Sequence, residues 1–221
     1  MTVEQFRRAM AAGVAFVVLI VAGVVIAYDN TPNIKRHDSD AVAAAKYVHK
    51  LSSSSNRTGI IVGAYLMILA ALAFVWFTQG LRMRAGSVAA GRLVSALGIF
   101  GAVAVAASAM FIANVAGAVS FGHEKVPNGD VIRVMMDLSF PFIGVVFALA
   151  SAAIIATILV TGRGAGLPAW ITVGGWLGVL GGIFAVIFLP IVLPLIWFLI
   201  VAIFGLRRPV AGDGESVAAA A

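Results

Sequence analysis

The chain has 221 residues, of which 62% are hydrophobic and 11% are charged, and its mean hydropathy is +1.08. Soluble domains usually contain about 45–50% apolar and about 25% charged residues. The composition therefore argues against a soluble enzyme, a disordered protein and a nucleic-acid-binding protein. The formal net charge of +6 arises from 15 Lys and Arg residues against 9 Asp and Glu residues, and we interpret it as a signal of membrane orientation. The absence of Cys excludes disulfides, thiolate metal sites and Cys nucleophiles.

Long apolar runs predict an all-α bundle of six transmembrane helices that forms one domain over residues 1–221, because about 20 apolar residues cross the hydrocarbon core. The last uncharged run, 169–206, would measure about 57 Å as one helix, nearly twice the roughly 30 Å core. It must fold back, and we place the reversal at Leu189–Pro190 because proline interrupts helical hydrogen bonding. Five spans with a re-entrant segment are the alternative. The predicted spans are about 10–28, 59–80, 93–118, 138–160, 169–188 and 190–206.

Six spans place both termini on one side of the membrane. The basic residues on that side, such as Arg82, Arg84 and Arg92, lie in short segments that flank the spans, whereas those on the other side lie in longer loops with several acidic residues. By the positive-inside rule we expect a protein of the cytoplasmic membrane with both termini in the cytoplasm. Arg7-Arg8 and the apolar run after it also resemble a signal peptide, but the run is longer than usual, so we expect an uncleaved first span. Residues 209–221 are expected to form a flexible tail.

The first outer loop, 29–57, is expected to contain a short amphipathic helix at about 40–51. Ser39 or Asp40 can cap this helix, and the alanines that follow favour it. Its apolar residues recur on one helical face, so the helix is predicted to lie on the membrane surface or against the spans. The residues of this face are Val42, Ala45, Val48 and Leu51.

All three histidines, His37, His49 and His123, fall in the two outer loops. With nearby acidic residues they supply the ligand types of a Zn²⁺ or Ni²⁺ site, or they could sense pH at the outer face. No closely spaced motif such as H-x₃-H supports a metal site. We expect solvated loop histidines and no cofactor, and the metal site remains a hypothesis.

No ionisable residue lies at the centre of a predicted span, which argues against a proton-coupled transporter or a pump. Milder polar residues lie near the outer ends of the third and fourth spans. Asn114 and Asp137 could approach each other there and, with Ser139, form a small ligand pocket. The structural alternative is that Asn114 packs helices together, while Asp137 complements a helix amino terminus beside Arg133.

Small residues recur every four positions along three predicted spans. Such faces let another helix backbone approach closely, and the partner helix can belong to this chain, to a second copy or to another membrane protein. The residues are Gly174, Gly178 and Gly182 in the fifth span, Gly98 and Ala102 in the third, and Gly144 and Ala148 in the fourth.

Several short segments accompany the six-span layout. The first outer loop combines Asp and Lys residues, and the runs that follow are Gly63-Ala64-Tyr65-Leu66, Arg82-Met83-Arg84 and Gly166-Leu167-Pro168-Ala169-Trp170. With these features the chain resembles the small six-span integral membrane proteins of unknown function that are common in actinobacteria, in which an LPxW element recurs. The resemblance implies a fold and a membrane location, because that family has no established activity.

Catalytic signatures such as HExxH and GxSxG do not occur in the sequence. We therefore expect a non-enzymatic membrane protein, surrounded by lipid, that acts as an accessory subunit or a component of a membrane complex. The alternatives are a transporter-like protein with a small-molecule or lipid pocket near the outer ends of spans three and four, and a metal- or pH-responsive protein that uses the outer histidines.

Overall fold

In a computed structural model the chain folds into a bundle of α-helices, and its description covers residues 1–34, 38–122, 125, 127–162, 166–185 and 191–208. Within these ranges no β-strand occurs. A 3-10 turn, η1, and a π-helical turn, η2, interrupt or extend the α-helices. In chain order the elements are α1 Val3–Asp29, α2 Asp40–Ser52, α3 Ser54–Leu81, η1 Arg82–Arg84, α4 Val88–Phe121, α5 Gly129–Pro141, η2 Phe142–Phe147, α6 Ala148–Thr161, α7 Ala169–Ile183 and α8 Val192–Arg207.

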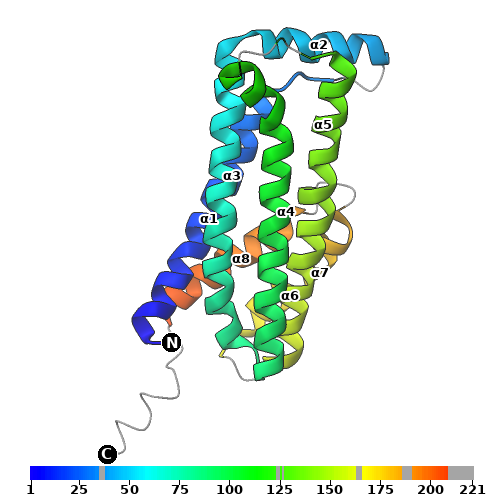
Figure 1. The fold of residues 1–221 in the computed structure, drawn as a ribbon. Coiled ribbons are helices and arrows are strands. Elements are labelled where there is room, and N and C mark those ends of the chain that lie inside the picture. Colours follow the sequence, from blue (N-terminus) through cyan, green and yellow to red (C-terminus); the bar gives the residue numbers. More distant parts are fainter. Residues whose placement is uncertain (35–37, 123–124, 126, 163–165, 186–190, 209–221) are drawn as a thin grey trace, which may run out of the picture.

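Four helical rods are long and apolar enough to cross a membrane: Val3–Asp29, Ser54–Arg84, Val88–Phe121 and Gly129–Thr161. The first four predicted spans lie within these rods, which run side by side with α5 and α6 joined end to end (Figure 1). Each rod extends beyond its apolar run, because a helix ends at its capping residues and not where the hydrophobic residues stop. The described residues thus form an all-helical fold in which four long apolar helices are candidate membrane spans.

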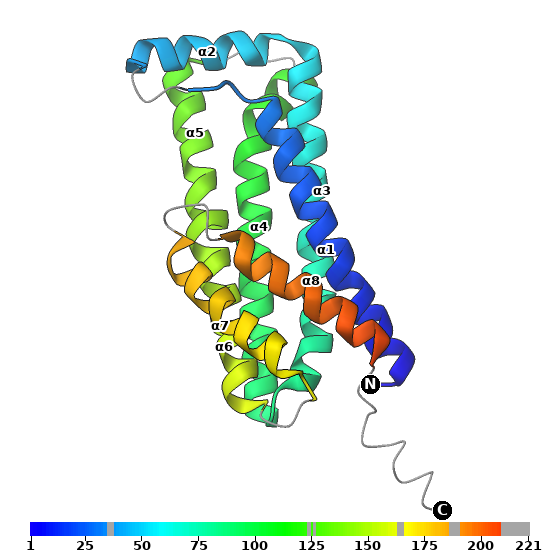
Figure 2. The same cartoon turned by 180° about the vertical axis from the view of Figure 1, so that it is seen from behind.

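The prediction of six spans is not confirmed, because the last two helices are short. α7 has 15 residues and α8 has 16, so at 1.5 Å per residue they measure about 22 to 24 Å, less than the roughly 30 Å hydrocarbon core. Both helices lie in the half of the bundle where α1 begins (Figure 2). α7 ends at Ile183, five residues before the predicted 188, and the predicted reversal at Leu189–Pro190 lies outside the described residues.

The two short helices α7 and α8 pack against other helices of the chain. Gly182 of α7 lies against α6, where an added Cβ would be 2.6 Å from the carbonyl oxygen of Ala148. The indole N–H of Trp197 on α8 donates a 3.0 Å hydrogen bond to the carbonyl oxygen of Ile171 on α7. Irregular backbone within a membrane is tolerated where protein covers it, and apolar length alone does not reveal that cover.

Phenylalanine rings join the hairpin to the long helices. Phe74 of α3 is 4.6 Å from Phe16 of α1, 5.3 Å from Phe147 of η2 and 5.5 Å from Phe198 of α8, measured between ring centroids. All four side chains are fully buried. Tilted and edge-to-face rings at such distances attract each other beyond the area they bury, so this cluster fixes α8 to α1 and α3.

The predicted small-residue faces pack mostly inside the chain. Gly98 contacts Thr78 of α3, Gly178 contacts Ile155 and Trp197, and Ala102 and Ala148 are buried. Gly144 contacts the ring of Phe140, one turn earlier in the same rod.

Gly174 differs from the other predicted glycines, because an added Cβ there would meet no atom within 4 Å. Its neighbour Gly175 contacts Leu159 and Trp197 instead. The packing face of α7 is therefore Gly175, Gly178 and Gly182. A four-residue repeat of glycine does not by itself say which glycines face a neighbour.

Helix α2 lies across the end of the bundle opposite the termini (Figure 1). The hydroxyl of Ser39 accepts a hydrogen bond from the backbone N–H of Val42, which caps the helix as predicted. Ala43, Tyr47 and Leu51 are buried, whereas Val42 and Ala45 of the predicted apolar face are exposed. The buried face is thus displaced around the helix, since it must fit the ends of α3, α4 and α5.

Candidate functional site

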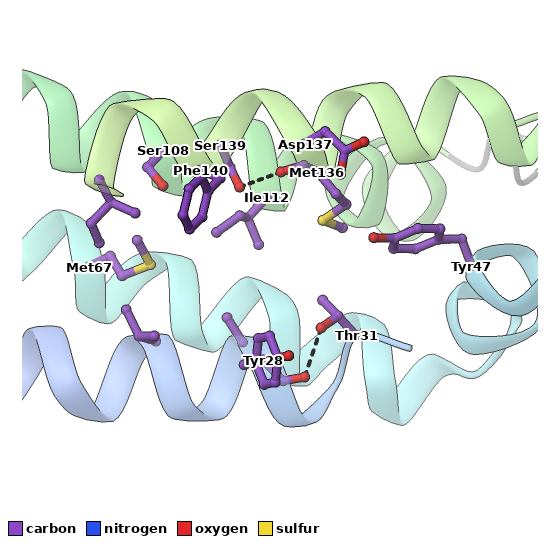
Figure 3. Close-up of a pocket in the computed structure, with 13 residues that line it drawn as sticks. Tyr28, Thr31, Tyr47, Met67, Ser108, Ile112, Met136, Asp137, Ser139 and Phe140 are labelled. Atoms are coloured by element: carbon purple, nitrogen blue, oxygen red, sulfur yellow. Dashed lines mark hydrogen bonds between the residues drawn. The ribbon is translucent and has the colours of Figure 1, made fainter. Parts of the chain in front are cut away.

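A cavity of about 560 Å³ lies between α1, α3, α4 and α5, at the end of the bundle that α2 covers (Figure 3). This volume falls in the range of about 300 to 1,000 Å³ that is typical of small-molecule sites. The walls are mainly apolar, with a few hydroxyl groups and one carboxylate. The cavity is lined by Val24, Ala27, Tyr28, Thr31, Tyr47, Met67, Ser108, Ile112, Met136, Asp137, Ser139, Phe140 and Ile143.

The wall from α5 is formed where the helix changes its hydrogen bonding. Met136, Ser139, Phe140 and Ile143 recur at the spacing of one helical face. Pro141 stands among them, and since proline has no N–H, the carbonyl of Asp137 lacks its usual helical donor. The π-helical turn η2 begins directly after Pro141. Such turns are frequent at functional sites, because they change which residues face inward.

Two serine hydroxyls line the cavity, and they differ in their bonding. The Ser139 hydroxyl donates a 2.6 Å hydrogen bond to the carbonyl oxygen of Met136 in its own helix. The Ser108 hydroxyl is fully buried and, among the described residues, has no hydrogen-bond partner. In Figure 3, Ser108 lies beside Phe140 at the end of the cavity away from Tyr47. An unpaired buried hydroxyl is costly, so this end of the cavity offers a site for a hydrogen-bonding ligand atom.

Tyr47 of α2 stands at the opposite end, with its hydroxyl directed toward the cavity (Figure 3). Its ring belongs to an apolar cluster beneath α2 that includes Leu51, Val115 and Ile132. Burial raises the pKa of the Tyr47 hydroxyl above its usual value, and the nearby negative charge of Asp137 raises it further. The phenol is therefore neutral and can donate a hydrogen bond at physiological pH.

The structure places Asp137 and Ser139 at the cavity but not Asn114. Asn114 is exposed on α4 and is not among the lining residues. On α4 the cavity faces Ser108 and Ile112, which are one turn apart, and Asn114 lies about 200° around the helix from Ile112. Asn114 thus points away, and the proposed approach of Asn114 to Asp137 does not occur.

Asp137 lies at the rim of the cavity. Its side chain is 67% exposed, and its carboxylate is 3.6 Å from Nε of Arg133, one turn earlier. This is the intrahelical pairing that the structural alternative predicts. Of the described lining residues, Asp137 alone carries a charge at neutral pH, so the interior of the cavity is uncharged.

The predicted histidine group is described only at His49, which is exposed on α2. His37 and His123 lie outside the described residues. In the described parts of the chain no three His, Asp or Glu side chains lie close enough together to hold a metal ion. The metal hypothesis therefore remains a prediction from sequence.

Sequence reasoning missed Tyr28, Thr31, Tyr47 and Ser108 as cavity residues. Thr31 donates a 2.8 Å hydrogen bond to the carbonyl oxygen of Tyr28, which closes the end of α1 beside the cavity. Of these four residues, Ser108 could have been predicted from sequence, because it places a hydroxyl within an otherwise apolar span. The others come from segments whose proximity depends on how α1 and α2 pack.

No protein-family model, curated protein or solved structure matches this chain. The resemblance to a six-span family therefore stays a prediction, and function has to be argued from the cavity. The cavity can hold an apolar molecule and offers it hydrogen bonds at both ends.

Proposed function

We propose that this chain is a non-enzymatic multi-pass protein of the cytoplasmic membrane that binds a small amphiphilic molecule or lipid in the cavity between α1, α3, α4 and α5. One observation carries the proposal. A cavity of about 560 Å³ with mainly apolar walls contains the buried, unpartnered hydroxyl of Ser108. Pockets with apolar walls and few polar groups are typical of ligand sites.

A binding role is preferred to catalysis because of what lines the cavity. The described lining residues include hydroxyl groups and the carboxylate of Asp137, but no His, Lys or Cys. Nucleophilic catalysis by a hydroxyl requires a base within hydrogen-bond reach, and the Ser139 hydroxyl is bonded to a backbone carbonyl instead. These features favour binding.

The proposed orientation places α2 outside the cell and both termini in the cytoplasm. The ends of the rods near the termini carry Arg7, Arg8, Arg82 and Arg92 in short segments, where the positive-inside rule is most reliable. The orientation can be tested by introducing single cysteines into this Cys-free chain and treating intact cells with a maleimide that does not cross the membrane. Ser55→Cys should react from outside, and Ala89→Cys only after permeabilisation. The reverse pattern would overturn the orientation.

Binding can be tested with a photoactivatable probe. The purified protein is reconstituted in phosphatidylcholine and phosphatidylglycerol vesicles that contain a diazirine-bearing hexadecanol, and the labelled peptides are identified by mass spectrometry. Peptides of α4 around Ser108 and of α5 around Phe140 should be labelled. Ile112→Trp fills the cavity and should reduce this labelling several-fold, whereas Ile99→Trp, at a site of α4 that is 52% exposed, should not. Equal labelling of both variants would contradict the proposal.

A role as a complex subunit finds less support. Gly98, Gly178 and Gly182 of the predicted small-residue faces contact other helices of this chain, so these glycines are not available to a partner or a second copy. Gly174 alone among them stands in open space. We therefore place the function at the cavity, with lipid as the surrounding partner.

A further inference from the structure

We propose that the cavity takes an uncharged amphiphile directly from the lipid phase, through a lateral opening between α1 and α5, and holds its oxygen-bearing group at Ser108. This inference rests on the proposed function and deepens it, because it names the class of ligand and the route by which the ligand enters.

The opening follows from the short length of the α7–α8 hairpin. α8 runs across the face of the bundle between α5 and α1, from Val192 at mid-height to the end near the start of α1 (Figure 2). Along this path Ala202 and Gly205 pack on the first half of α1. A full-length helix would continue over the second half of α1. Among the described residues α8 does not extend over the second half of α1, and Val24, Ala27 and Tyr28 of that half line the cavity.

The two helices that border the opening, α1 and α5, pack mainly on other helices of the chain and not on each other. α1 packs mainly on α3 and α8, and α5 packs on α4 and α2. Tyr28 of α1 and Phe140 of α5 both line the cavity while remaining 72% and 37% exposed. Side chains that belong both to the cavity wall and to the outer surface mark the edge of an opening. Because the surrounding faces are apolar, this edge meets lipid.

The water-facing end of the cavity is closed by α2. Ala43, Tyr47 and Leu51 of this helix are 2%, 9% and 1% exposed. An added Cβ at Gly129, where α5 begins, would overlap the backbone of Ala44, so α2 lies directly on the end of α5. This contact separates the cavity from the water beyond α2 and favours access from the bilayer.

The chemistry of the ligand follows from the lining groups. The buried Ser108 hydroxyl has no partner among the described residues. It can donate a hydrogen bond to a ligand oxygen, or accept one from a ligand hydroxyl. The one charged lining group, Asp137, is largely exposed and faces Arg133. A charged ligand head placed at Ser108 would be desolvated without an opposite charge beside it, because Asp137 lies at the rim of the cavity. An alcohol, ester or ketone group attached to an apolar body fits these groups.

A second buried serine provides a matched control. The Ser151 hydroxyl on α6 is also buried without a partner in the described part of the chain, but Ser151 is not among the cavity residues. If the Ser108 hydroxyl serves only helix packing, Ser108→Ala and Ser151→Ala should behave alike. If it holds a ligand, only Ser108→Ala should change binding.

The ligand class is tested with two diazirine probes of equal chain length, hexadecanol and hexadecanoate, in the reconstituted full-length protein. We expect the alcohol to label the α4 and α5 peptides several-fold more than the carboxylate does. Ser108→Ala should reduce alcohol labelling about three- to fivefold, the factor that one hydrogen bond of average strength provides. Ser151→Ala should leave it unchanged. Equal labelling by both probes, or equal effects of both substitutions, would overturn the assignment of the ligand class.

The route is tested by reversible cross-linking, which is specific because the natural chain contains no Cys. Val24→Cys on α1 with Ile143→Cys on η2 joins the two sides of the opening through a bis-methanethiosulfonate linker. Leu51→Cys with Ile132→Cys fixes α2 to α5 in the apolar cluster outside the cavity. Because Val24 and Ile143 line the cavity, the reference is the same double-cysteine protein with a monofunctional methanethiosulfonate of equal length on each cysteine. Relative to this reference, the first lock should abolish labelling by alcohol that is added afterwards, and reduction should restore it. The second lock should have no effect.

The outcomes separate this inference from the proposed function. If only the α2 lock blocks labelling, the cavity binds the probe but access is from the water side, and lateral access is wrong. If neither lock has an effect, the opening between α1 and α5 is also not the route. If the unlocked protein shows no labelling of the cavity peptides, the proposed function itself fails.

Discussion

The indole N–H of Trp197 donates a 3.0 Å hydrogen bond to the carbonyl oxygen of Ile171, and it joins the two helices of a hairpin that reaches only half-way through the bundle. Trp197 is 2% exposed, and its ring is 5.7 Å from that of Phe198. The same side chain therefore fills the space between α7 and α8 and satisfies a polar group within the membrane. This contact helps to hold α7 and α8 together.

Trp197→Phe should destabilise the protein modestly, because it removes the hydrogen bond and retains most of the ring. Hydrogen bonds between membrane helices contribute about 0.6 kcal/mol on average and up to about 1.7 kcal/mol. Trp197→Ala also creates a cavity and should cost about 3–5 kcal/mol. Unfolding by sodium dodecyl sulfate in mixed micelles measures both values. Trp170→Phe, at a site that is 60% exposed, is the control. A Trp197→Phe protein as unstable as Trp197→Ala would contradict this ranking.

Gly182→Ala should destabilise the contact of α7 with α6. The added methyl would lie 2.6 Å from the backbone oxygen of Ala148 and 2.7 Å from Cβ of Ala152, and backbone cannot move aside as a flexible side chain can. Overpacking of this kind costs about 1–3 kcal/mol.

Gly174→Ala is the matched control on the same helix, because its methyl would meet open space. It should be neutral or stabilise by up to about 1 kcal/mol, since alanine favours helix more than glycine does. Thermal aggregation of the detergent-solubilised protein compares the two variants. Equal loss of stability in both would show that the packing face of α7 is misplaced.

Arg84 should couple energetically to Phe6. Arg84 is 2% exposed, and its guanidinium carbon is 5.6 Å from the ring centroids of both Phe6 and Phe204. Because Arg84 has other interactions, a double-mutant cycle with Arg84→Gln and Phe6→Leu is needed to isolate the contact. We expect a coupling energy of about 0.5–2 kcal/mol from unfolding measurements. A cycle of Arg84→Gln with Phe100→Leu, which lies on the exposed side of α4, should give none.

Alkaline pH should loosen α2. Burial and the charge of Asp137 raise the pKa of Tyr47, against a smaller opposing effect of Arg133. The neutral phenol is thus favoured in the folded protein. Its contribution to stability is complete below the unfolded pKa of about 10 and is lost as the pH rises through the folded value. Tyrosinate absorbance and the free energy of unfolding should be measured together as a function of pH. Both should change as the pH rises through the pKa of Tyr47 in the folded protein, and this change is the expected step. Tyr47→Phe should remove it, and a wild-type step that persists in the variant would exclude Tyr47 as its source.

The four long spans were predictable because each is a separate apolar run bounded by polar loops. The cap of α2 by Ser39 was predictable for a similar reason, since capping depends on neighbours in sequence. The buried face of α2 was not. Tyr47 turns inward because the ends of α4 and α5 offer its ring a place beside Val115 and Ile132, and nothing within α2 records where those helix ends lie.

The residues of the candidate site also fall into those that the sequence predicted and those that it did not. Asp137 and Ser139 lie at the cavity because α5 presents them there, and their place near the end of a predicted span was readable from sequence. Asn114 was placed with them by its depth in the membrane, but it faces away because depth does not set rotation about the helix axis. Ser108 became a candidate only when its hydroxyl was found buried without a partner in the described structure.

Length, composition and charge by themselves determined that this chain is an apolar helical protein with long spans and its charged residues outside them. Transfer of residues into lipid depends on local composition, so a sequence records it directly. Tertiary structure decided that the described helices of the uncharged run 169–206, α7 and α8, are shorter than the four long apolar helices, and that a cavity lies beside the second half of α1. Those outcomes depend on contacts between distant segments, such as Trp197 with Ile171, which no local pattern contains.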